Sequence, residues 1–439
     1  MIYRCPTLEP RGGGRLDAVW WATPVLLLSY LGVVCLTSPD AWRLAPAVTL
    51  FNGLLAAGLA LALLALGGTW VAGLRAQHAE SLLRPSTTFG FALFPALAGG
   101  LGSWPGAAAA LAGWGQALFL VALTLLLIAA VWHVGAGERQ QRLLGAAEQR
   151  TGRPSWRDFY ALTKMGLNAL VLVTTSIGFY LASRGGIDGW LFLWALSGTA
   201  LVAAGSSVLN QFIERDVDAL MERTANRPLP AGRLRPFEAL LFGTGLSLVG
   251  LLILIWRVNL LTAFLGGLTL AVYLFLYTPM KRTSTLSTLA GAISGAVPPV
   301  MGWTATGEPI GPLAVVLFLI LFFWQEPHFL AIGWKYRKQY GAAGFPLYSV
   351  LDSRGKATAA QAVWYAAALL ATTLAPLALG TGGAVYGTAA ALAGIGFAAL
   401  AIRFWFRPAR GSAMALFFGS IAYLPLTLLL VLFLGGAQG

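Results

Sequence analysis

Charged side chains are scarce in this chain of 439 residues, because only 10% of them are Asp, Glu, Lys or Arg. An average soluble protein carries about a quarter of its residues as these four types. Hydrophobic residues make up 58% of the sequence, and the mean hydropathy is +0.74. One soluble core cannot bury so much apolar surface, so the composition excludes a soluble globular protein and indicates a chain that crosses a membrane many times.

Cysteine and histidine are also rare, and each absence excludes a class of site. Cys5 and Cys35 are too few for a disulfide framework or a zinc site. The three histidines, His78, His133 and His328, are too few for a metal centre that is built from several imidazoles. The alternating pattern of an outer-membrane barrel is missing. We also expect no cleaved secretory signal, because the first apolar run is full length and lacks a cleavage site.

Apolar segments of about 20 residues are what the sequence has in abundance, and each can cross a hydrocarbon core of about 30 Å as a helix. Thirteen are predicted, at roughly 17–37, 46–73, 88–107, 113–133, 166–183, 188–209, 238–256, 259–277, 286–304, 311–333, 358–379, 383–402 and 413–435. The longest polar interruption, 135–165, separates four segments from nine. We therefore predict an all-α polytopic membrane protein with a four-helix N-terminal region (1–135), a cytoplasmic linker (136–155) and a nine-helix domain (156–439).

The net charge of +13 follows from the placement of the basic residues. If the N-terminus is cytoplasmic, all Lys and Arg residues except Arg43, Arg184 and Arg257 fall on the cytoplasmic side. This distribution is the positive-inside pattern, with some affinity for anionic lipid, and it argues against a nucleic-acid partner. The polar loops of the second part lie on the same predicted face, so we expect the chemistry near the cytoplasmic side.

Residues 205–235 hold the first polar cluster, which has four carboxylates within nine residues. Asn210, Glu214 and Asp218 are spaced i, i+4, i+8 and share one helix face, while Asp216 lies off that line near the helix end. Stacked carboxylates repel unless a cation lies between them, and hard oxygen ligands suit Mg²⁺ with a substrate phosphate. The alternative is a solvated helix end whose acids pair with Arg215 and Arg223.

Basic residues follow this acidic face. Arg223, Arg227 and Arg233 suit a diphosphate, because guanidinium groups bind phosphate oxygens in pairs. Tyr277 opens a second cluster on the same predicted face, and Lys281 and Arg282 within it are candidates for the same phosphates or for ordinary membrane anchoring. The prolines at 298 and 299 are predicted to break the next helix near mid-membrane and to form a cavity wall.

The third cluster is the run Trp324-Gln325-Glu326-Pro327-His328-Phe329, close to the same face. Ionisable residues so near a membrane interior are functional candidates. A single histidine does not hold a metal ion alone, but His328 can ligate a haem iron or move a proton.

With these runs in view, residues from about 155 to 439 resemble the UbiA-type intramembrane prenyltransferases, and among them the haem branch, the protohaem IX farnesyltransferases or haem O synthases. The stretches that carry the resemblance are 210–230 (NQFIERDVDALMERTANRPLP), 277–303 (YTPMKRTSTLSTLAGAISGAVPPVMGW), 324–329 (WQEPHF) and 343–347 (AGFPL). The resemblance implies nine helices around a cavity and Mg²⁺-assisted transfer of farnesyl from farnesyl diphosphate to a vinyl group of protohaem IX. Water then completes haem O, and pyrophosphate leaves.

The resemblance also implies roles for individual residues. Metal–diphosphate binding falls to Asn210, Glu214 and Asp218, with Asp216 in support. The leaving group is neutralised by Arg223, Arg227, Lys281 and Arg282, and His328 acts on the haem side; further substrate contacts are expected from Tyr277, Trp324 and Gln325. This sequence departs from the family in having Glu at 214 and at 326, and Gln339-Tyr340 where Asp-Tyr is usual.

Two alternatives stay open at this point: a prenyltransferase for an aromatic quinone or chlorophyll precursor, and a non-catalytic haem-binding membrane protein. The missing second Asp-rich motif argues against a quinone precursor. The N-terminal helices match the size of half a haem A synthase, the enzyme that acts next and a possible partner; since they offer only His78 and His133, we interpret them as a degenerate or structural module. The bias towards alanine, glycine, leucine and arginine favours a bacterium and hence its inner membrane. The placement of the basic residues favours a cytoplasmic N-terminus.

Overall fold

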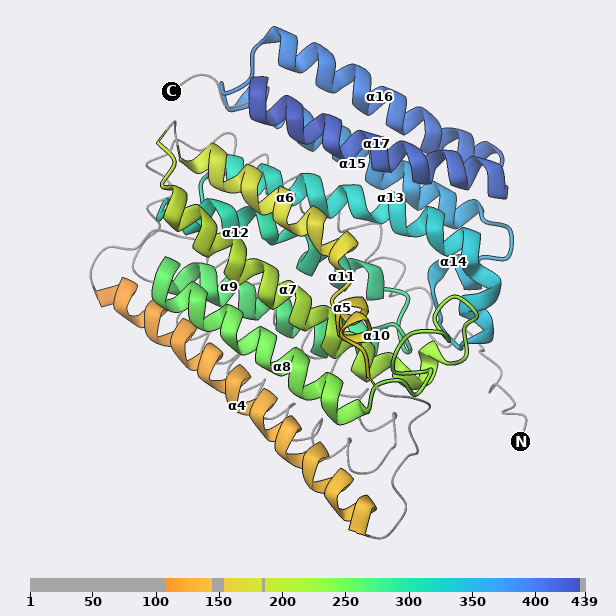
Figure 1. Ribbon diagram of the computed structural model, residues 1–439. Helices are drawn as coiled ribbons and strands as arrows, with labels where there is room; N and C mark the ends of the chain where they lie inside the picture. Colours follow the sequence, from red (N-terminus) through yellow and green to blue (C-terminus); the bar gives the residue numbers. More distant parts are fainter. Residues whose placement is uncertain (1–106, 144–153, 184–185, 435–439) are drawn as a thin grey trace. The chain divides into compact units, whose positions relative to one another are not determined.

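The computed structural model describes residues 107–143, 154–183 and 186–434, and all regular elements within these ranges are helices (Figure 1). The three predicted spans before residue 107 and His78 lie outside the described residues. In chain order the elements are α4 (Ala107–Leu143), α5 (Trp156–Leu162), α6 (Met165–Ala182), α7 (Gly189–Asp218), α8 (Pro236–Ile253), η3 (Leu254–Val258), α9 (Leu260–Ala271), η4 (Val272–Tyr277), α10 (Thr278–Met280), α11 (Ser287–Ala296), α12 (Pro298–Ala305), α13 (Pro312–Ala342), α14 (Tyr348–Leu351), α15 (Lys356–Ala378), α16 (Ala384–Phe406) and α17 (Arg410–Leu434).

Nine helical stretches within the described ranges are long and apolar enough to cross a membrane. One is the central part of α4, and eight lie in the region predicted to form the nine-helix domain. The remaining predicted segment of that domain, 286–304, is divided into α11 and α12 at Val297. Proline at the first positions of α12 cannot continue the hydrogen bonding of α11, so the predicted break is confirmed. The all-α membrane fold is likewise confirmed for the described residues.

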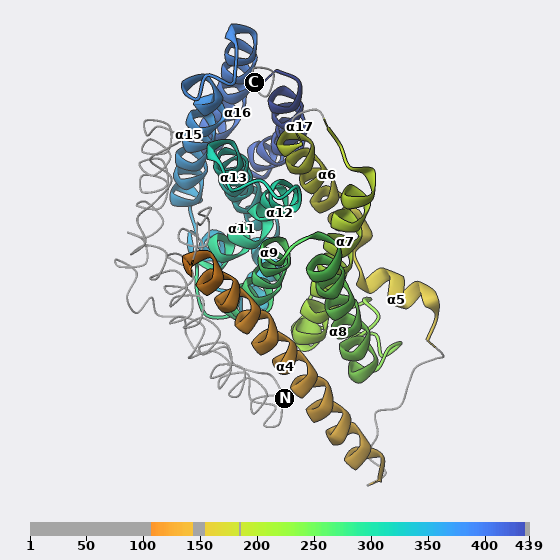
Figure 2. The same cartoon turned by 90° about the vertical axis from the view of Figure 1, so that its left-hand side faces the viewer.

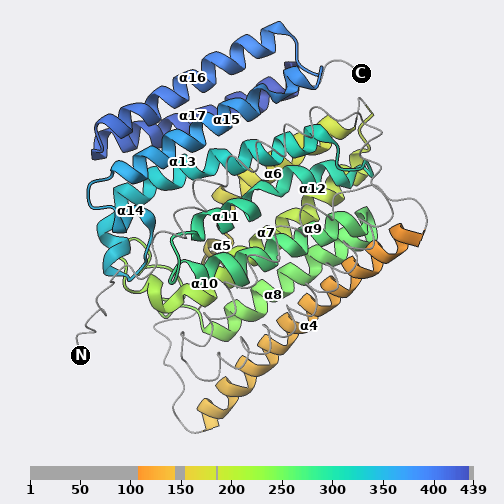
Figure 3. The ribbon, with the colours of Figure 1, turned by 180° about the vertical axis from the view of Figure 1, so that it is seen from behind.

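Two compact units make up the described chain. The first contains the described chain up to Met280 together with Ile293–Leu317, and the second contains Lys281–Ala292 and the chain from Phe318 onward. In the first unit, α7 packs along α8 and α6 packs along α12. In the second unit, α15, α16 and α17 lie side by side, as Figure 3 shows.

Helices α6 and α12 approach each other backbone to backbone. A Cβ atom on Gly302 would overlap the carbonyl oxygen of Thr175, and one on Gly178 would overlap the carbonyl oxygen of Pro299. Small residues at such positions allow helices in a membrane to pack closely by van der Waals contact. The glycines on both sides therefore fix α12, the second half of the broken span, against α6.

Helix α4 lies against α9 and α8, as Figure 2 shows. The ring of Phe119 on α4 meets the ring of Phe264 on α9 edge to face at 5.1 Å, and the side chains of Leu120 and Leu123 cover Gly267. Helix α4 also continues to Leu143, so the first residues of the predicted linker are helical. The fourth helix of the predicted N-terminal region is thus packed on helices of the predicted nine-helix domain. The division into domains stays a prediction.

Candidate active site

Helix α7 carries the predicted acidic cluster at its C-terminal end. Its start is capped by Asp188, whose carboxylate accepts hydrogen bonds from the backbone N–H groups of Trp190 and Leu191 at 2.9 and 3.0 Å. Its 30 residues give a length of about 45 Å at about 1.5 Å per residue. This exceeds a hydrocarbon core of about 30 Å, so one end of α7 can hold polar groups outside the apolar layer.

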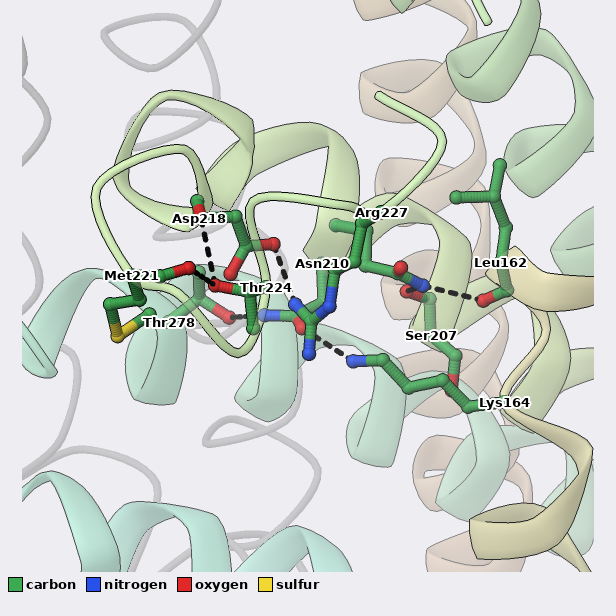
Figure 4. A network of polar contacts seen from close by, with 10 residues as sticks. Leu162, Lys164, Ser207, Asn210, Asp218, Met221, Thr224, Arg227 and Thr278 are labelled. Atoms are coloured by element: carbon green, nitrogen blue, oxygen red, sulfur yellow. Dashed lines mark hydrogen bonds and ion pairs between the residues drawn. The ribbon is translucent and has the colours of Figure 1, made fainter. Parts of the chain in front are cut away.

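Asn210 lies at the centre of a buried hydrogen-bond network (Figure 4). Its side chain is 1% exposed; Oδ1 accepts from the Nζ of Lys164 at 3.2 Å, and Nδ2 donates to the Oγ1 of Thr278 at 3.0 Å. Thr278 follows the π-helical turn η4, and its hydroxyl donates in turn to the carbonyl of Tyr273 at 2.7 Å. Three chain segments therefore meet at this amide.

Lys164 reaches Asn210 from an unusual backbone conformation. It precedes α6 with φ of 49° and ψ of 47°, and it is the one non-glycine residue with positive φ in the described ranges. Residues in this left-handed region persist where the surrounding structure holds them, often at functional sites. Gln211 fixes the same junction, because its Nε2 donates to the carbonyl of Leu162 at 2.7 Å.

Asp218, the last residue of α7, forms a buried ion pair. Its side chain is 2% exposed, and Oδ2 lies 2.6 Å from Nη1 of Arg227, whose side chain is 26% exposed. Glu214 and Lys164 are near enough to interact electrostatically with the same carboxylate. Asn210, Glu214 and Asp218 therefore lie towards one end of α7, as their spacing predicted, and the loop after the helix adds Arg227 to them.

The loop that brings Arg227 back to α7 is held from two sides. The hydroxyl of Thr224 donates to the backbone carbonyl of Asp218 at 2.8 Å. Arg233, a predicted phosphate contact, instead donates through Nε to Asp158 at 2.8 Å and through Nη2 to the carbonyl of Asn226 at 2.9 Å. Its hydrogen bond holds the pKa of the Asp158 carboxyl below its ordinary value, although burial acts in the opposite direction.

The remaining predicted residues of this end are placed differently. Asp216 has a side chain that is 81% exposed, and its Oδ1 lies 3.7 Å from Nε of Arg215. Arg223 is exposed on the loop, and Tyr277 is half-buried at the end of η4. Lys281 and Arg282 belong to the second unit, so their contribution beside Asp218 stays a prediction.

Helix α13 places the third cluster inside the second unit. The rings of Trp324 and His328 stack with centroids 5.2 Å apart, and Phe417 lies 4.8 Å from the imidazole. Nδ1 of His328 lies 2.8 Å from Oγ of Ser420, and the indole N–H of Trp324 donates to the carbonyl of Ser420 at 2.7 Å. The imidazole of His328 therefore lies among aromatic rings.

Gln325 and Glu326 point to other surroundings than His328. Nε2 of Gln325 donates to the carbonyls of Ala292 and Leu321 at 3.2 and 3.0 Å, which joins α11 to α13. Glu326 is fully buried, and its Oε2 accepts from the hydroxyl of Thr288 at 3.1 Å. Oε1 of Glu326 has no hydrogen-bond partner within the part of the chain that the structure describes.

Comparisons with known proteins agree with this architecture and with the sequence runs. The model of the UbiA prenyltransferase family matches residues 171–433. The chain belongs to the UbiA prenyltransferase family. It is 42% identical over 279 residues to a protoheme IX farnesyltransferase of Solibacter usitatus, covering 62% of this chain and 96% of that protein. An enzyme of the same name from Opitutus terrae is 43% identical over 272 residues, covering 62% of this chain and 92% of that protein.

The structural comparison supports the same fold for this prenyltransferase. A solved structure of a digeranylgeranylglyceryl phosphate synthase superposes with a TM-score of 0.57 at 17% identity, covering 64% of this chain and 99% of that one. This likeness concerns the fold. The matched region begins inside α6, so α4 lies outside the family match.

The oxygen atoms at the end of α7 are of the chemical kind that suits a magnesium ion sharing its coordination with a substrate. Within the described residues, no group of three or more His, Cys, Asp and Glu side chains is close enough to hold a metal ion by itself. Mg²⁺ characteristically binds one or two carboxylates and completes its shell with water and substrate phosphates. Glu214, Asp218 and the amide oxygen of Asn210 are donors of that kind; in this structure Asp218 pairs with Arg227, and the Asn210 oxygen accepts from Lys164.

Three residues that contact the predicted site residues were not among the sequence candidates. Lys164 was counted among the basic residues that orient the chain, and only its left-handed turn shows that its amine reaches Asn210. Thr278 lies in the run that starts at Tyr277, but no pattern marks its hydroxyl there, and Ser420 lies in the mainly apolar helix α17. Each residue is recognised as part of a polar contact only from its hydrogen-bond partner elsewhere in the chain.

Proposed function

We propose that this chain transfers the farnesyl group of farnesyl diphosphate to a vinyl group of protohaem IX, with addition of water, to give haem O and pyrophosphate. The observation that carries the proposal is the match to relatives of that name over more than nine-tenths of their length, which includes the acidic face of α7. The buried polar network at Asn210 and Asp218 supports the diphosphate half of the reaction.

Cleavage of farnesyl diphosphate is the first demand on the site. The C1–oxygen bond breaks, its electron pair leaves with pyrophosphate, and an allylic cation develops on the farnesyl group. Groups that are preorganised around the departing charge lower this barrier most where bulk water is excluded. Arg227 and Lys164, both of the first unit, would stabilise the negative charge of the leaving pyrophosphate. Further positive charge is proposed to come from Arg223, Lys281 and Arg282. Mg²⁺, held by Asn210, Glu214 and Asp218 with Asp216 in support, would supply Lewis-acid neutralisation of the phosphates.

Attack by the vinyl group is the second demand. A new carbon–carbon bond forms between farnesyl C1 and the vinyl group, the positive charge passes to the other vinyl carbon, and water adds there with loss of one proton. Trp324, His328 and Phe417 form an aromatic surround that suits the planar porphyrin. Gln325 and Tyr277 are proposed as further substrate contacts.

The proposal includes a cellular setting. The chain is a multi-pass membrane protein, and the distribution of Lys and Arg supports a bacterial inner membrane with a cytoplasmic N-terminus. The diphosphate site would then face the cytoplasm, where farnesyl diphosphate is soluble, and protohaem IX would enter with membrane lipid around it. Haem A synthase is the proposed consumer of the product.

The test uses purified full-length protein in detergent with protohaem IX, farnesyl diphosphate and Mg²⁺, and mass analysis of the pigments. The expected product is heavier than protohaem by one farnesyl group plus one hydroxyl group, and it disappears when a chelator removes Mg²⁺. Parallel reactions offer 4-hydroxybenzoate as an aromatic acceptor. Prenylation of that ring instead would assign an aromatic substrate, and haem binding without any product would indicate a non-catalytic haem-binding protein.

A further inference from the structure

The hydrogen bonds around Ser420 determine which nitrogen of His328 carries the proton. A serine hydroxyl has one hydrogen to donate and lone pairs to accept with. Oγ of Ser420 donates that hydrogen to the backbone carbonyl of Phe417 at 2.6 Å. The 2.8 Å contact between Oγ of Ser420 and Nδ1 of His328 therefore requires the imidazole to donate. In the neutral ring, Nδ1 carries the hydrogen and Nε2 carries the lone pair.

The surroundings keep both partners in this arrangement. Ser420 is fully buried, so water does not compete for its hydroxyl. The indole N–H of Trp324 donates to the backbone carbonyl of Ser420 at 2.7 Å, and the indole ring stacks on the imidazole with an interplanar angle of 27°. Phe417 covers the imidazole with its centroid 4.8 Å away. Helices α13 and α17 are thus joined at one point that fixes the ring's plane and its hydrogen.

We propose that Ser420 is a positioning residue that holds His328 as its Nδ1–H tautomer, so that the Nε2 lone pair is presented to the haem iron as a ligand. The inference rests on the proposed haem substrate. It assigns His328 a ligand role and excludes a neutral imidazole that donates a proton from Nε2. Partners that orient a ligating histidine through its other nitrogen are a general feature of metal sites, and their loss typically weakens metal binding about 10- to 100-fold.

The tautomer is measured directly by ¹⁵N NMR of full-length protein labelled at histidine, without haem, at about pH 8, above the ordinary imidazole pKa of about 6.5. The chain has only three histidines, and the H328Q variant identifies the signal of His328. The wild-type protein is expected to show Nδ1–H at His328. In Ser420→Ala the signal is expected to shift towards the Nε2–H tautomer, because the acceptor is gone.

Ser412→Ala is the matched control. Ser412 lies near the start of the same helix and is buried; its Oγ contacts the backbone carbonyls of Arg407 and Ala409 and accepts from the N–H of Ala409 at 3.3 Å. The variant removes another buried serine hydroxyl of α17, one that has no contact with the imidazole. The His328 signal is expected to stay as in the wild-type protein.

Haem titration followed by the absorption spectrum is the second measurement. Ser420→Ala is expected to bind ferric protohaem about 10- to 100-fold more weakly, with loss of the spectral signature of imidazole ligation, while Ser412→Ala binds as the wild type. Wild-type Nε2–H, or an unchanged Nδ1–H signal in Ser420→Ala, would overturn the positioning role. Haem binding with no imidazole signature would overturn the ligand role. Binding with the signature but without haem O formation would refute the proposed function and leave the positioning role standing.

Discussion

Nη1 of Arg227 lies 2.6 Å from Oδ2 of Asp218, and this carboxylate is almost completely buried at the end of a membrane-spanning helix. The two residues are nine positions apart, and a folded loop closes the distance. A buried carboxylate without a cation is costly in a low-dielectric surrounding. The arginine therefore has a structural task before any substrate arrives, in addition to its proposed contact with diphosphate.

The first prediction concerns the stability of this pair. Arg227→Ala leaves the Asp218 carboxylate buried without its partner and is expected to destabilise the fold by about 3–5 kcal/mol. The double variant Asp218→Asn/Arg227→Ala should recover part of the loss, because no buried charge is left. Thermal unfolding in detergent measures both, with the exposed Lys338→Ala as control. Equal unfolding temperatures for Arg227→Ala and the wild type would contradict the structural role.

The second prediction concerns turnover. Asp218→Asn keeps the size of the side chain and removes its charge, so the protein should still fold and insert. Its kcat should fall by a factor of about 10²–10³, the usual effect of removing one preorganised electrostatic group. Haem O formation is the measurement. Glu222→Gln, an exposed acid four residues further along, is the matched control and should retain activity. Near-normal turnover in Asp218→Asn would refute the metal–diphosphate assignment.

The third prediction tests the contact between α6 and α12. Gly302→Ala places a methyl group against the carbonyl of Thr175 and requires the backbones to separate. Overpacking of this kind typically costs about 1–3 kcal/mol. Gly245→Ala is the control, because its Cβ would meet nothing within 4 Å. The ratio of folded to aggregated protein after detergent extraction should fall for the first variant only, and equal yields would argue against the close contact.

The fourth prediction concerns pH. Arg233 holds the pKa of Asp158 below its ordinary value of 3.8 in the folded protein. The ionised Asp158 therefore contributes stability that is fully present above 3.8 and is lost as the pH falls through the lower, folded-state pKa. The unfolding temperature of the wild type should decrease more steeply with acidification than that of Asp158→Asn. Parallel curves for the two proteins would show that this ion pair adds nothing to acid stability.

The sequence predicts most of the fold because the membrane imposes a simple rule on it. Apolar runs of sufficient length correspond to helices, and α6, α7, α8 and α13 lie where those runs predicted spans. The break between α11 and α12 was also predictable, since two adjacent prolines cannot continue a helix. The packing of α4 on α9 was not predictable, because a membrane helix that is apolar on all sides gives no sign of which face contacts lipid and which contacts protein.

The site is predictable only where its residues share one helix. The spacing of Asn210, Glu214 and Asp218 places them on one face whatever the rest of the chain does. Arg227 was predicted by its charge, but its partner was not, since the path of the loop after α7 depends on bonds such as that of Thr224. Ser420 is 92 residues from His328 in the chain, and no local pattern connects them.

At Lys164 the left-handed backbone costs stability, while the side chain makes a buried hydrogen bond to Asn210. Glycine suits such a conformation, whereas a residue with a Cβ loses about 1–2 kcal/mol there. Lys164→Gly relieves this cost but leaves the buried Oδ1 of Asn210 without the amine that donates to it, a loss of about 1–3 kcal/mol. The unfolding temperature is therefore expected to stay close to that of the wild type while the affinity for farnesyl diphosphate falls. A calorimetric titration beside a melting curve measures both, and an unchanged affinity would contradict the proposed role of the amine. The left-handed turn before α6 is thus offset by the buried hydrogen bond that it makes possible, so backbone strain and a buried polar contact are coupled at one residue.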